Sequence, residues 1–357
     1  MFMKLHFLLL GACLGSRLSA AEPPAPLEWR VGMSVEAKDS LDTAGEQNPD
    51  AAECLAGLTW PKQKFTVRCE SAGTNNSQGD WILRYPSPIP SGDALNDQVA
   101  VEWYVAKDAQ KQPIKARAVV VVHESGRGMA AARIMCSGLR NNRFHAFLVH
   151  LPGYGARTSE FTTNAKAMLP GLRQAIAYVR RAKDAVAALP FVETSSISLQ
   201  GTSMGGFVVA TVAGLDRCFD RVFILLAGGD LAEVLLTGEK DAAGVRKKLM
   251  DAGLTEPDIR QQTKRVEPLR LATRLNPERT WLFSGRDDEV VPQKCSVALA
   301  TAAKLPGEHH LVLPVGHYSA AFLFPSVLKQ MVNILNDRPM MENVPPMPNI
   351  PPPVKSK

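Results

Sequence analysis

The chain has 357 residues, of which 45% are hydrophobic and 21% are charged, and its formal net charge is +6. This length and composition allow one large globular domain or two modest ones, and they exclude a chain that is disordered over most of its length. The basic residues are spread along the sequence rather than gathered in runs. We interpret the pairs Arg180-Arg181 and Lys247-Lys248 as solvated helix faces, so nucleic acid is not expected as a partner.

The first 20 residues have the pattern of a secretory signal peptide. Lys4 precedes an apolar stretch from Leu5 to Leu14, and small residues at 19–21 precede a Pro-rich segment. No stretch of the sequence has about 18 continuous apolar residues, so an integral membrane protein is not expected. We expect an exported protein, periplasmic or extracellular. Lipid anchoring at Cys13, in a loose match to a lipoprotein box, is the less favoured alternative.

Residues 21–62 are polar and turn-rich with little periodicity, which predicts an N-terminal extension. In an oxidising compartment Cys54 and Cys69 are the best candidates for a disulfide, because they lie only 15 residues apart just before the main core. A closed loop of that size would stabilise the fold by about 3 kcal/mol. No C-x-x-C motif occurs and the cysteines are scattered, which argues against a structural zinc site.

The pattern of strands changes partway along the chain. β-rich runs at 64–70, 80–85, 98–106 and 116–124 indicate an antiparallel beginning of a sheet. From Val119 onward, short apolar strands alternate with helical stretches, which predicts a parallel α/β sheet whose ligands bind beyond the carboxyl ends of its strands. These later strands are expected within 119–122, 147–155, 196–201, 222–229, 279–285 and 309–316. The last residues, 337–357, are Pro-rich and predict a flexible tail or a surface-docking strip.

A serine stands in a glycine-rich turn between one strand and one helix. The stretch 201–206, GTSMGG, follows the strand ISLQ and precedes the helical FVVATVAG. This is a G-x-S-x-G motif in a strand–turn–helix setting, which presents the hydroxyl of Ser203 at the tip of a tight turn. A glycine-rich turn that only packs a helix against a strand would look the same locally, so the functional interpretation needs a base, an acid and an oxyanion hole elsewhere.

Five motifs in chain order resemble the α/β-hydrolase superfamily over residues 63–336. They are HESGRG (123–128), HLPGYGAR (150–157), GTSMGG (201–206), GRDDEVVP (285–292) and GHYSAAF (316–322). The resemblance implies an α/β-hydrolase fold: a mostly parallel central sheet flanked by helices, with an antiparallel N-terminal lead-in. Secreted esterases and dienelactone-hydrolase-like proteins are the most similar branches, although dienelactone hydrolases use a cysteine where this chain has Ser203.

The resemblance implies a catalytic triad of Ser203, Asp288 and His317. Ser203 needs a base to become an effective nucleophile, and His317 follows an apolar strand in a Gly-His turn downstream of the other two members. Asp288 is favoured over its neighbour Asp287, because the family places the acid three residues after a glycine, here Gly285.

Four other histidines are not expected to be the catalytic base. His309 and His310 are expected to face solvent at the start of their strand, whereas His123 and His150 end strands near the site and could orient loops.

The oxyanion hole implied by the family uses two backbone N–H groups. One is that of Met204, after the nucleophile. The other is that of Ser125, with Glu124 as the alternative. No cofactor and no metal are expected. The segment 231–265 is predicted to be helical, amphipathic and charged, and it is either a small cap over the site or a plain surface insertion.

These features predict a serine hydrolase that cleaves a small-molecule carboxylic ester through an acyl-enzyme. A serine peptidase of the prolyl-oligopeptidase type is one alternative, although about 60 residues before the sheet cannot build that family's propeller. A non-catalytic binding protein on a hydrolase scaffold is the other. The acyl and alcohol parts of the substrate do not follow from the sequence.

Overall fold

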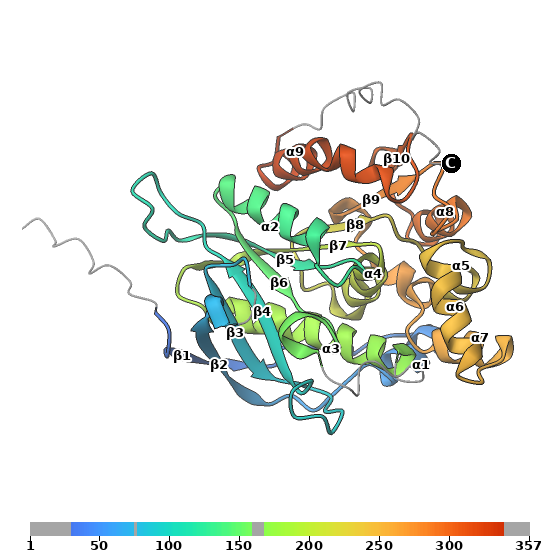
Figure 1. Cartoon of the computed structure of the whole chain (residues 1–357), viewed down its shortest axis with the longest axis horizontal. Helices are drawn as coiled ribbons and strands as arrows, with labels where there is room; N and C mark the ends of the chain where they lie inside the picture. The colour runs from blue at the N-terminus through green and yellow to red at the C-terminus, as the bar shows by residue number, and fades with distance from the viewer. Residues whose placement is uncertain (1–29, 75–76, 159–167, 339–357) are drawn as a thin grey trace, which may run out of the picture.

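The computed structural model describes residues 30–74, 77–158 and 168–338, and its centre is one ten-stranded sheet with helices on both faces (Figure 1). The predicted signal peptide, Cys13 and nearly all of the Pro-rich tail lie outside the described residues. In spatial order the strands are β1 (Ser34–Lys38), β2 (Lys64–Ser71), β3 (Trp81–Pro86), β4 (Gln98–Tyr104), β6 (His145–Val149), β5 (Ala116–Val122), β7 (Val192–Thr202), β8 (Val222–Leu225), β9 (Thr280–Gly285) and β10 (His310–Leu313).

The sheet changes from antiparallel to parallel near the position where the sequence pattern changes. The run at 116–124, which was predicted in the antiparallel part, is β5 and pairs parallel with both β6 and β7. Strands β1 to β4 pair antiparallel with one another, and β4 pairs antiparallel with β6. All pairs from β6 to β10 are parallel. This confirms the predicted fold class, a mostly parallel sheet with an antiparallel N-terminal lead-in.

The residue patterns of the strands explain their places in the sheet. β5 is a nearly continuous run of buried valines, because helices cover both faces of the sheet there. β2 alternates between exposed and buried residues, as expected for a strand with one face toward water. The central strands therefore form the rigid base to which the functional loops are attached.

The helices divide between the two faces of the sheet and pack on two separate hydrophobic clusters. One face carries α2 (Ala130–Asn141) and α9 (Phe324–Leu335). The other carries α1 (Pro49–Ala56), α3 (Met168–Ala187), α4 (Met204–Asp216) and α8 (Gln293–Ala302). After β8 the chain forms α5 (Leu231–Thr237), α6 (Asp241–Asp251) and α7 (Glu256–Lys264), so the prediction of helices in 231–265 is confirmed.

The segment predicted as an N-terminal extension is integrated with the sheet from residue 30 on. β1 pairs with β2 in a five-residue register, and α1 follows it. Leu41, Leu55 and Trp60 are buried in the same hydrophobic cluster as the central strands. The strand and the helix are both short, so neither produces a periodic pattern long enough to be recognised in the sequence.

The predicted disulfide between Cys54 and Cys69 is wrong. The thiol of Cys54, on α1, lies 3.8 Å from the carbonyl oxygen of Arg265, and the structure contains no bond between it and Cys69. Cys69 lies five residues beyond Lys64, where β2 begins. At about 3.3 Å per residue, the extended strand carries Cys69 some 16 Å from its start. The two cysteines thus lie on different elements, α1 and β2, and are not joined.

The interpretation of Arg180 and Arg181 as a solvated helix face is also wrong, because both residues are fully buried on α3. Arg180 binds the carboxylates of Asp184 and Asp216, and Arg181 binds Asp39 through two nitrogens at 2.9 and 2.5 Å. A buried charge must be paired to be tolerated. Two of these partners are distant in the sequence, which is why the helix pattern alone did not indicate the burial.

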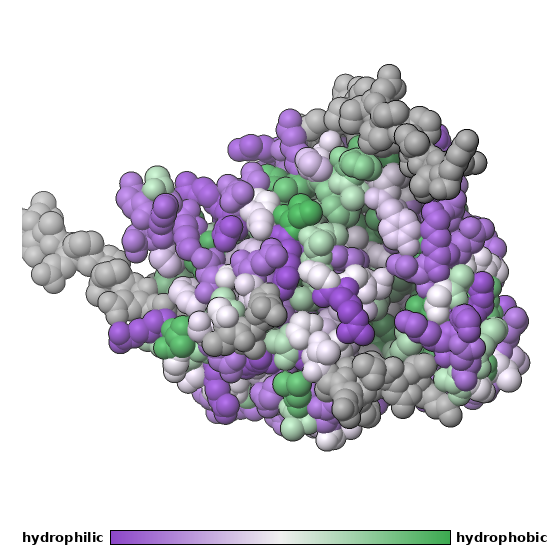
Figure 2. Space-filling model, in the orientation of Figure 1, coloured by the Kyte–Doolittle hydropathy of each residue, from purple (hydrophilic) through white to green (hydrophobic). Residues whose placement is uncertain are grey.

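The visible surface is mixed in polarity. In Figure 2, hydrophobic side chains gather over the region where α2 and α9 lie in Figure 1, while α6 and α7 are largely hydrophilic. Ile134 on α2 and Phe322 just before α9 are the most exposed of the large hydrophobic residues, at 57% and 60%. Within the described residues, no helix is both long and apolar enough to cross a membrane.

Candidate active site

The motifs singled out in the sequence meet at one edge of the sheet. Each of them follows a parallel strand: β5, β6, β7, β9 or β10. The carboxyl ends of parallel strands lie at the same edge, and ligands of open α/β sheets bind there. The loops after these strands therefore form the candidate active site.

Ser203 occupies a strained turn between β7 and α4, with φ 54° and ψ −119°. A non-glycine residue rarely adopts this conformation, and where it persists the surrounding structure holds it. Here the flanking glycines allow very close packing. A Cβ on Gly201 would lie 2.3 Å from the carbonyl oxygen of Gly205, and a Cβ on Gly205 would lie 2.4 Å from that of Val122.

The three predicted triad residues are brought together in one hydrogen-bonded chain. Ser203 Oγ lies 2.9 Å from His317 Nε2, and His317 Nδ1 lies 2.7 Å from Asp288 Oδ2. A carboxylate can only accept, so Nδ1 carries a proton and donates a hydrogen bond to Asp288. Nε2 is then free of a proton and can accept the hydrogen bond of Ser203.

The structure distinguishes clearly between the two adjacent aspartates. The side chain of Asp288 is 2% exposed, and its second oxygen accepts the N–H groups of Val290 and Val291 at 2.9 and 2.8 Å. Asp287 is exposed and pairs with Arg286 on the surface. Only Asp288 contacts the histidine, and Asp288 is the aspartate that the resemblance to the family favours.

The proposed oxyanion donors lie on two packed elements. Met204 is the first residue of α4, so its N–H has no acceptor within the helix. The close approach of Gly205 brings the start of α4 against the end of β5, where the loop with Glu124 and Ser125 begins. The phenol of Tyr154 donates to the carbonyl oxygen of Ser125 at 3.0 Å and ties this loop to the one after β6.

Glu124 has a structural role that the sequence analysis missed. Its carboxylate accepts the N–H groups of Ala131 and Ala132 at 3.0 and 3.3 Å, in the first turn of α2. A negative group at this end of a helix also interacts favourably with the helix dipole. The spacing of seven residues from glutamate to helix has no motif of its own, so the sequence carried no clear signal for this cap.

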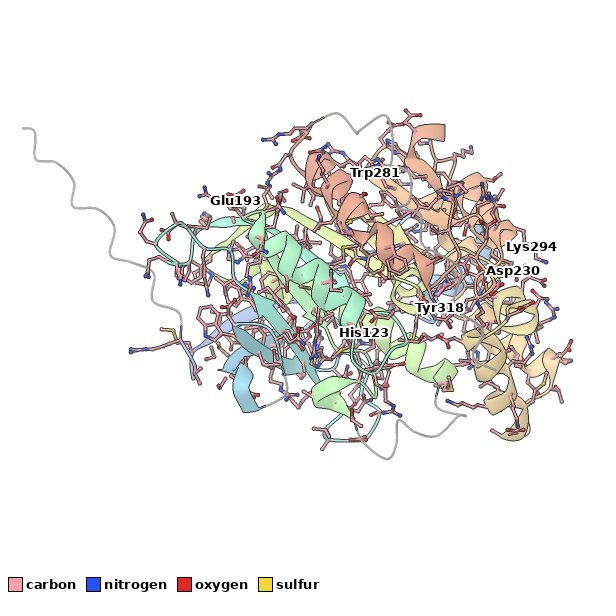
Figure 3. The ribbon with its side chains drawn as sticks, turned by 45° about the horizontal axis from the view of Figure 1, so that its top comes forward. His123, Glu193, Asp230, Trp281, Lys294 and Tyr318 are labelled. Atoms are coloured by element: carbon pink, nitrogen blue, oxygen red, sulfur yellow. The ribbon has the colours of Figure 1, made fainter. Side chains whose placement is uncertain are left out.

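His123 and His150 hold the backbone of the loop after β6, as their places at strand ends suggested (His123 is labelled in Figure 3). His123 Nε2 accepts the N–H of Leu151 at 3.1 Å, and His150 Nδ1 accepts that of Ala156 at 3.1 Å. Burial lowers the pKa of His123 to about 3 and also lowers the pKa of His150. Both rings are therefore neutral and serve as fixed acceptors.

The buried carboxylate of Glu102, on β4, holds His150 in place and so supports the loop after β6. One oxygen accepts from His150 at 3.0 Å and from Arg133 at 2.6 Å, and the other accepts from Tyr104 at 2.9 Å. Burial acts to raise the pKa of Glu102, but the hydrogen bonds from His150 and Arg133 outweigh it and lower the pKa to about 2. The sequence analysis missed this role of Glu102. The sign of it in the sequence was a single glutamate inside the otherwise apolar run QVAVEWY.

His309 and His310 do not both face solvent as predicted. His309 is 9% exposed, its ring lies 4.4 Å from that of Trp281, and its Nδ1 donates to the carbonyl oxygen of Pro277 at 2.9 Å. His310 is half-buried beside Ser284. The short helical turn before β10 folds His309 back over the sheet, which the strand pattern does not reveal.

The connection between α5 and α6 reaches the loops of the site. The N–H of Glu239 donates to the carbonyl oxygen of Glu289 at 2.8 Å, and the ammonium of Lys240 pairs with the carboxylate of Glu289. Lys240 also lies over the ring of Tyr318, 5.4 Å from its centre, and Tyr318 follows His317 (Figure 3). The segment 231–265 is thus fastened to the loops that carry the acid and the histidine.

Within the described ranges, no three His, Cys, Asp or Glu side chains gather where they could hold a metal ion.

The strand order, the turn at Ser203 and the order of the three aligned residues define the α/β-hydrolase fold, and the chain has that fold. The structure is similar to a puromycin-hydrolysing peptidase of Mycobacterium tuberculosis, with a TM-score of 0.55 and 15% identity over 76% of this chain and 45% of the peptidase. It is also similar to an acetyl xylan esterase from Paenibacillus sp. R4, with a TM-score of 0.53 and 14% identity over 83% of this chain and 96% of the esterase.

A third similar structure is an acylaminoacyl peptidase of Pyrococcus horikoshii, with a TM-score of 0.51 and 12% identity over 70% of this chain and 40% of the peptidase. The chain therefore matches less than half the length of either peptidase. The sequence matches no family model, and no curated protein matches it either.

Proposed function

We propose that this protein is a serine hydrolase that cleaves carboxylic esters through an acyl-enzyme formed on Ser203. The observation that carries the proposal is the aligned chain from Ser203 through His317 to Asp288, with donor–acceptor distances of 2.9 and 2.7 Å. It has the geometry that a serine needs to be activated by a general base. The aspartate is itself held by two backbone N–H groups, so the imidazole is fixed in one orientation.

The reaction uses each group in turn. Ser203 Oγ attacks the ester carbonyl carbon while its proton passes to His317 Nε2, and Asp288 stabilises the imidazolium that forms. The N–H groups of Met204 and of Ser125, or alternatively Glu124, stabilise the oxyanion. His317 then protonates the departing alcohol. Water attacks the acyl-enzyme with His317 as base, which releases the acid and restores Ser203.

The extent of the structural matches supports an esterase over a peptidase. The acetyl xylan esterase is matched over 96% of its length, whereas the two peptidases are matched over 45% and 40% of theirs. A peptidase of this kind remains the second candidate, because the same triad cleaves amides. We also propose that the protein is exported, on the signal-like pattern of residues 1–20. N-terminal sequencing of the protein from fractionated cells, with a start after residue 19, 20 or 21, would support this.

Labelling with a fluorophosphonate probe tests the proposed function directly. The wild-type protein should be labelled, and the Ser203→Ala variant should be neither labelled nor active while its thermal midpoint stays nearly unchanged. Matched nitrophenyl esters and nitroanilides then separate an esterase from a peptidase. Full labelling of Ser203→Ala would remove the nucleophile assignment, and faster cleavage of the anilides would favour the peptidase.

A further inference from the structure

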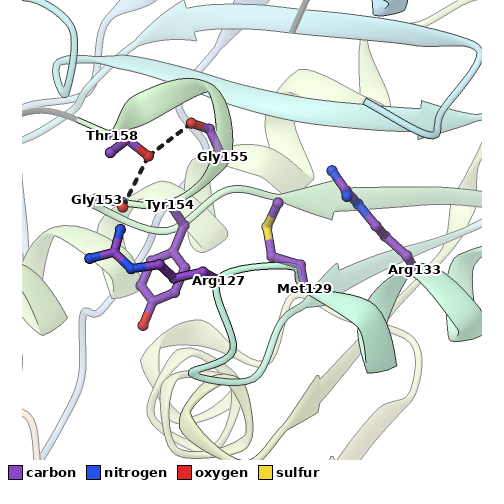
Figure 4. Close-up of a pocket in the computed structure, with 7 residues that line it drawn as sticks. All are labelled: Arg127, Met129, Arg133, Gly153, Tyr154, Gly155 and Thr158. Carbon is purple, nitrogen blue, oxygen red and sulfur yellow. Dashed lines mark hydrogen bonds between the residues drawn. The ribbon is translucent and has the colours of Figure 1, made fainter. Parts of the chain in front are cut away.

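A pocket lies beside the proposed oxyanion loop, between the turns at 125–129 and 153–158. It has a volume of about 200 Å³ (Figure 4). Its lining residues are Arg127, Met129, Arg133, Gly153, Tyr154, Gly155 and Thr158. The two turns follow β5 and β6, which are neighbouring parallel strands, so the pocket lies at the same edge of the sheet as Ser203.

Tyr154, which forms one wall of the pocket, contacts the loop that carries Ser125. The hydroxyl of Tyr154 donates to the carbonyl oxygen of Ser125 at 3.0 Å, and the ring of Tyr154 packs on that of His123 with 4.5 Å between centres. Ser125 is also the proposed second oxyanion donor. The pocket therefore adjoins the loop that is proposed to hold the carbonyl oxygen of the substrate.

The positive charge of the pocket is concentrated at Arg127. Figure 4 shows Arg127 and Arg133 on opposite sides of the pocket, with Met129 between them. The guanidinium of Arg133 is neutralised by Glu102 at 2.6 Å. Arg127 is exposed and forms no ion pair with any residue in the described part of the chain. The nearby carboxylate of Glu124 keeps its negative charge, but it accepts the N–H groups at the start of α2 and forms no ion pair with Arg127.

We propose that this pocket binds an anionic substituent of the substrate, such as a carboxylate on the acyl or the alcohol part, and that Arg127 selects for it. The inference rests on the proposed ester hydrolysis and adds a substrate class to it. A guanidinium presents a planar pair of donors that matches a carboxylate. The volume of about 200 Å³ admits a small group of this kind.

Asp241 places a negative charge beside the same loop, the one that carries Ser125 and Arg127. Its carboxylate lies 3.5 Å from the hydroxyl of Ser125, at the start of α6. A negative group there disfavours an anionic substrate, so the two residues should act with opposite sign. This gives the proposal a second, independent test.

The experiment compares pairs of esters that differ in one charge. Mono-4-nitrophenyl succinate carries a carboxylate on its acyl part, and 4-nitrophenyl butyrate is its neutral counterpart. 3-Acetoxybenzoate and its methyl ester are the corresponding pair for the alcohol part. The measured quantity is the ratio of kcat/KM for the anionic ester to that for the neutral ester. It is determined for the wild type, Arg127→Gln, Asp241→Asn and the control Arg143→Gln, which removes an exposed arginine beyond the other end of α2.

In at least one pair, Arg127→Gln should lower this ratio about fivefold, because an exposed ion pair contributes up to about a factor of five in affinity. Asp241→Asn should raise the ratio and Arg143→Gln should leave it unchanged. The effect of Arg127→Gln should shrink in 0.5 M salt, where exposed charges are screened. The control Arg143→Gln should hydrolyse the neutral esters at the wild-type rate.

Equal ratios in the wild type and Arg127→Gln for both pairs would overturn the proposal, as would an equal effect of Arg143→Gln. The neutral esters report separately on the proposed function, which fails if the wild type hydrolyses none of them. A calorimetric measurement needs no turnover: mono-4-nitrophenyl succinate should bind Ser203→Ala about fivefold more tightly than it binds the double variant Ser203→Ala/Arg127→Gln. Equal affinities would contradict the pocket assignment even if the protein is not an esterase.

Discussion

At the scale of single residues, Asp288 has two tasks that its neighbour Asp287 cannot perform. One oxygen orients His317 and the other is fixed by the backbone of Val290 and Val291. The two aspartates are adjacent in the chain but have different environments. Asp288 is buried, whereas Asp287 lies at the surface against Arg286. This makes the two aspartates a matched set for testing.

Asp288→Asn should lower kcat by about 10⁴-fold, because an amide at this place favours the wrong imidazole tautomer. Asp287→Asn is the control and should change kcat by less than about twofold. Steady-state hydrolysis of a nitrophenyl ester measures both. If the two variants had equal activities, or if Asp287→Asn were the weaker enzyme, the assignment of the acid would be contradicted.

Gly205 and Gly244 provide a second comparison at this scale. A Cβ on Gly205 would meet the carbonyl oxygens of Val122 and His123 at 2.4 and 2.6 Å, whereas a Cβ on Gly244 would meet nothing within 4 Å. Gly205→Ala should therefore displace the start of α4 and cost about 10²-fold in kcat, the usual effect of a shift of about 1 Å at a reacting centre.

Gly244→Ala, at the fourth residue of α6, should leave kcat unchanged and raise the free energy of unfolding by about 0.5–1 kcal/mol. Ester hydrolysis measures kcat for both variants, and urea unfolding measures their free energies of unfolding. Wild-type activity of Gly205→Ala would show that the close contact with β5 does not hold the oxyanion side in place.

At the scale of elements, the buried arginines of α3 hold the N-terminal segment against the domain. Arg181→Met should lower the free energy of unfolding by about 3–5 kcal/mol, because it leaves the Asp39 carboxylate buried without its cation. The double variant Asp39→Leu/Arg181→Met should recover a large part of that loss. Urea denaturation measures both free energies.

Lys247→Met is the control for this comparison. It breaks an ion pair with Asp251 on α6 whose side chains are 75% and 62% exposed, and it should change the free energy of unfolding by less than about 0.5 kcal/mol. A loss in Arg181→Met no larger than that in Lys247→Met would contradict a stabilising role for the buried pair.

What the sequence predicts well at this scale are the elements whose signal is local. The valine run of β5, the turn at Ser203 and the order of the loops all follow from neighbouring residues, and the structure has them as predicted. The features that sequence reasoning missed depend on distant partners. The burial of Arg181 requires Asp39, and the thiol of Cys54 contacts the carbonyl oxygen of Arg265 instead of Cys69. Such contacts leave no periodic pattern in either segment.

At the scale of the whole molecule, three buried histidines make the fold sensitive to mild acid. His123, His145 and His150 are fully buried. Burial lowers the pKa of His123 to about 3, that of His145 to about 4, and also that of His150. In the unfolded chain a histidine has a pKa of about 6.5, so between about pH 6.5 and 4 the unfolded state binds protons that the folded state does not.

The stability due to these histidines should therefore be complete above about pH 6.5 and should fall as the pH is lowered. Each histidine contributes about 1.4 kcal/mol per pH unit below that value. Urea unfolding at pH 7.5, 6.5, 5.5 and 5.0 should show a free energy that is flat at first and then falls steeply, before most carboxylates titrate. An unchanged free energy between pH 7.5 and 5.0 would contradict the neutral, buried state of these rings.

The contacts of Asp39 and Ser40 have a consequence for the order in which the chain is completed during synthesis. These residues are among the first described ones to leave the ribosome, yet their side chains bind Arg181 and Asp184, which lie 142 and 144 residues later. At about 5–20 residues per second, the N-terminal segment waits roughly 7–28 s for its partners to be translated. The contacts of Asp39 and Ser40 with α3 therefore form only after α3 has emerged, whereas the neighbouring strand β1 can pair with β2 long before that.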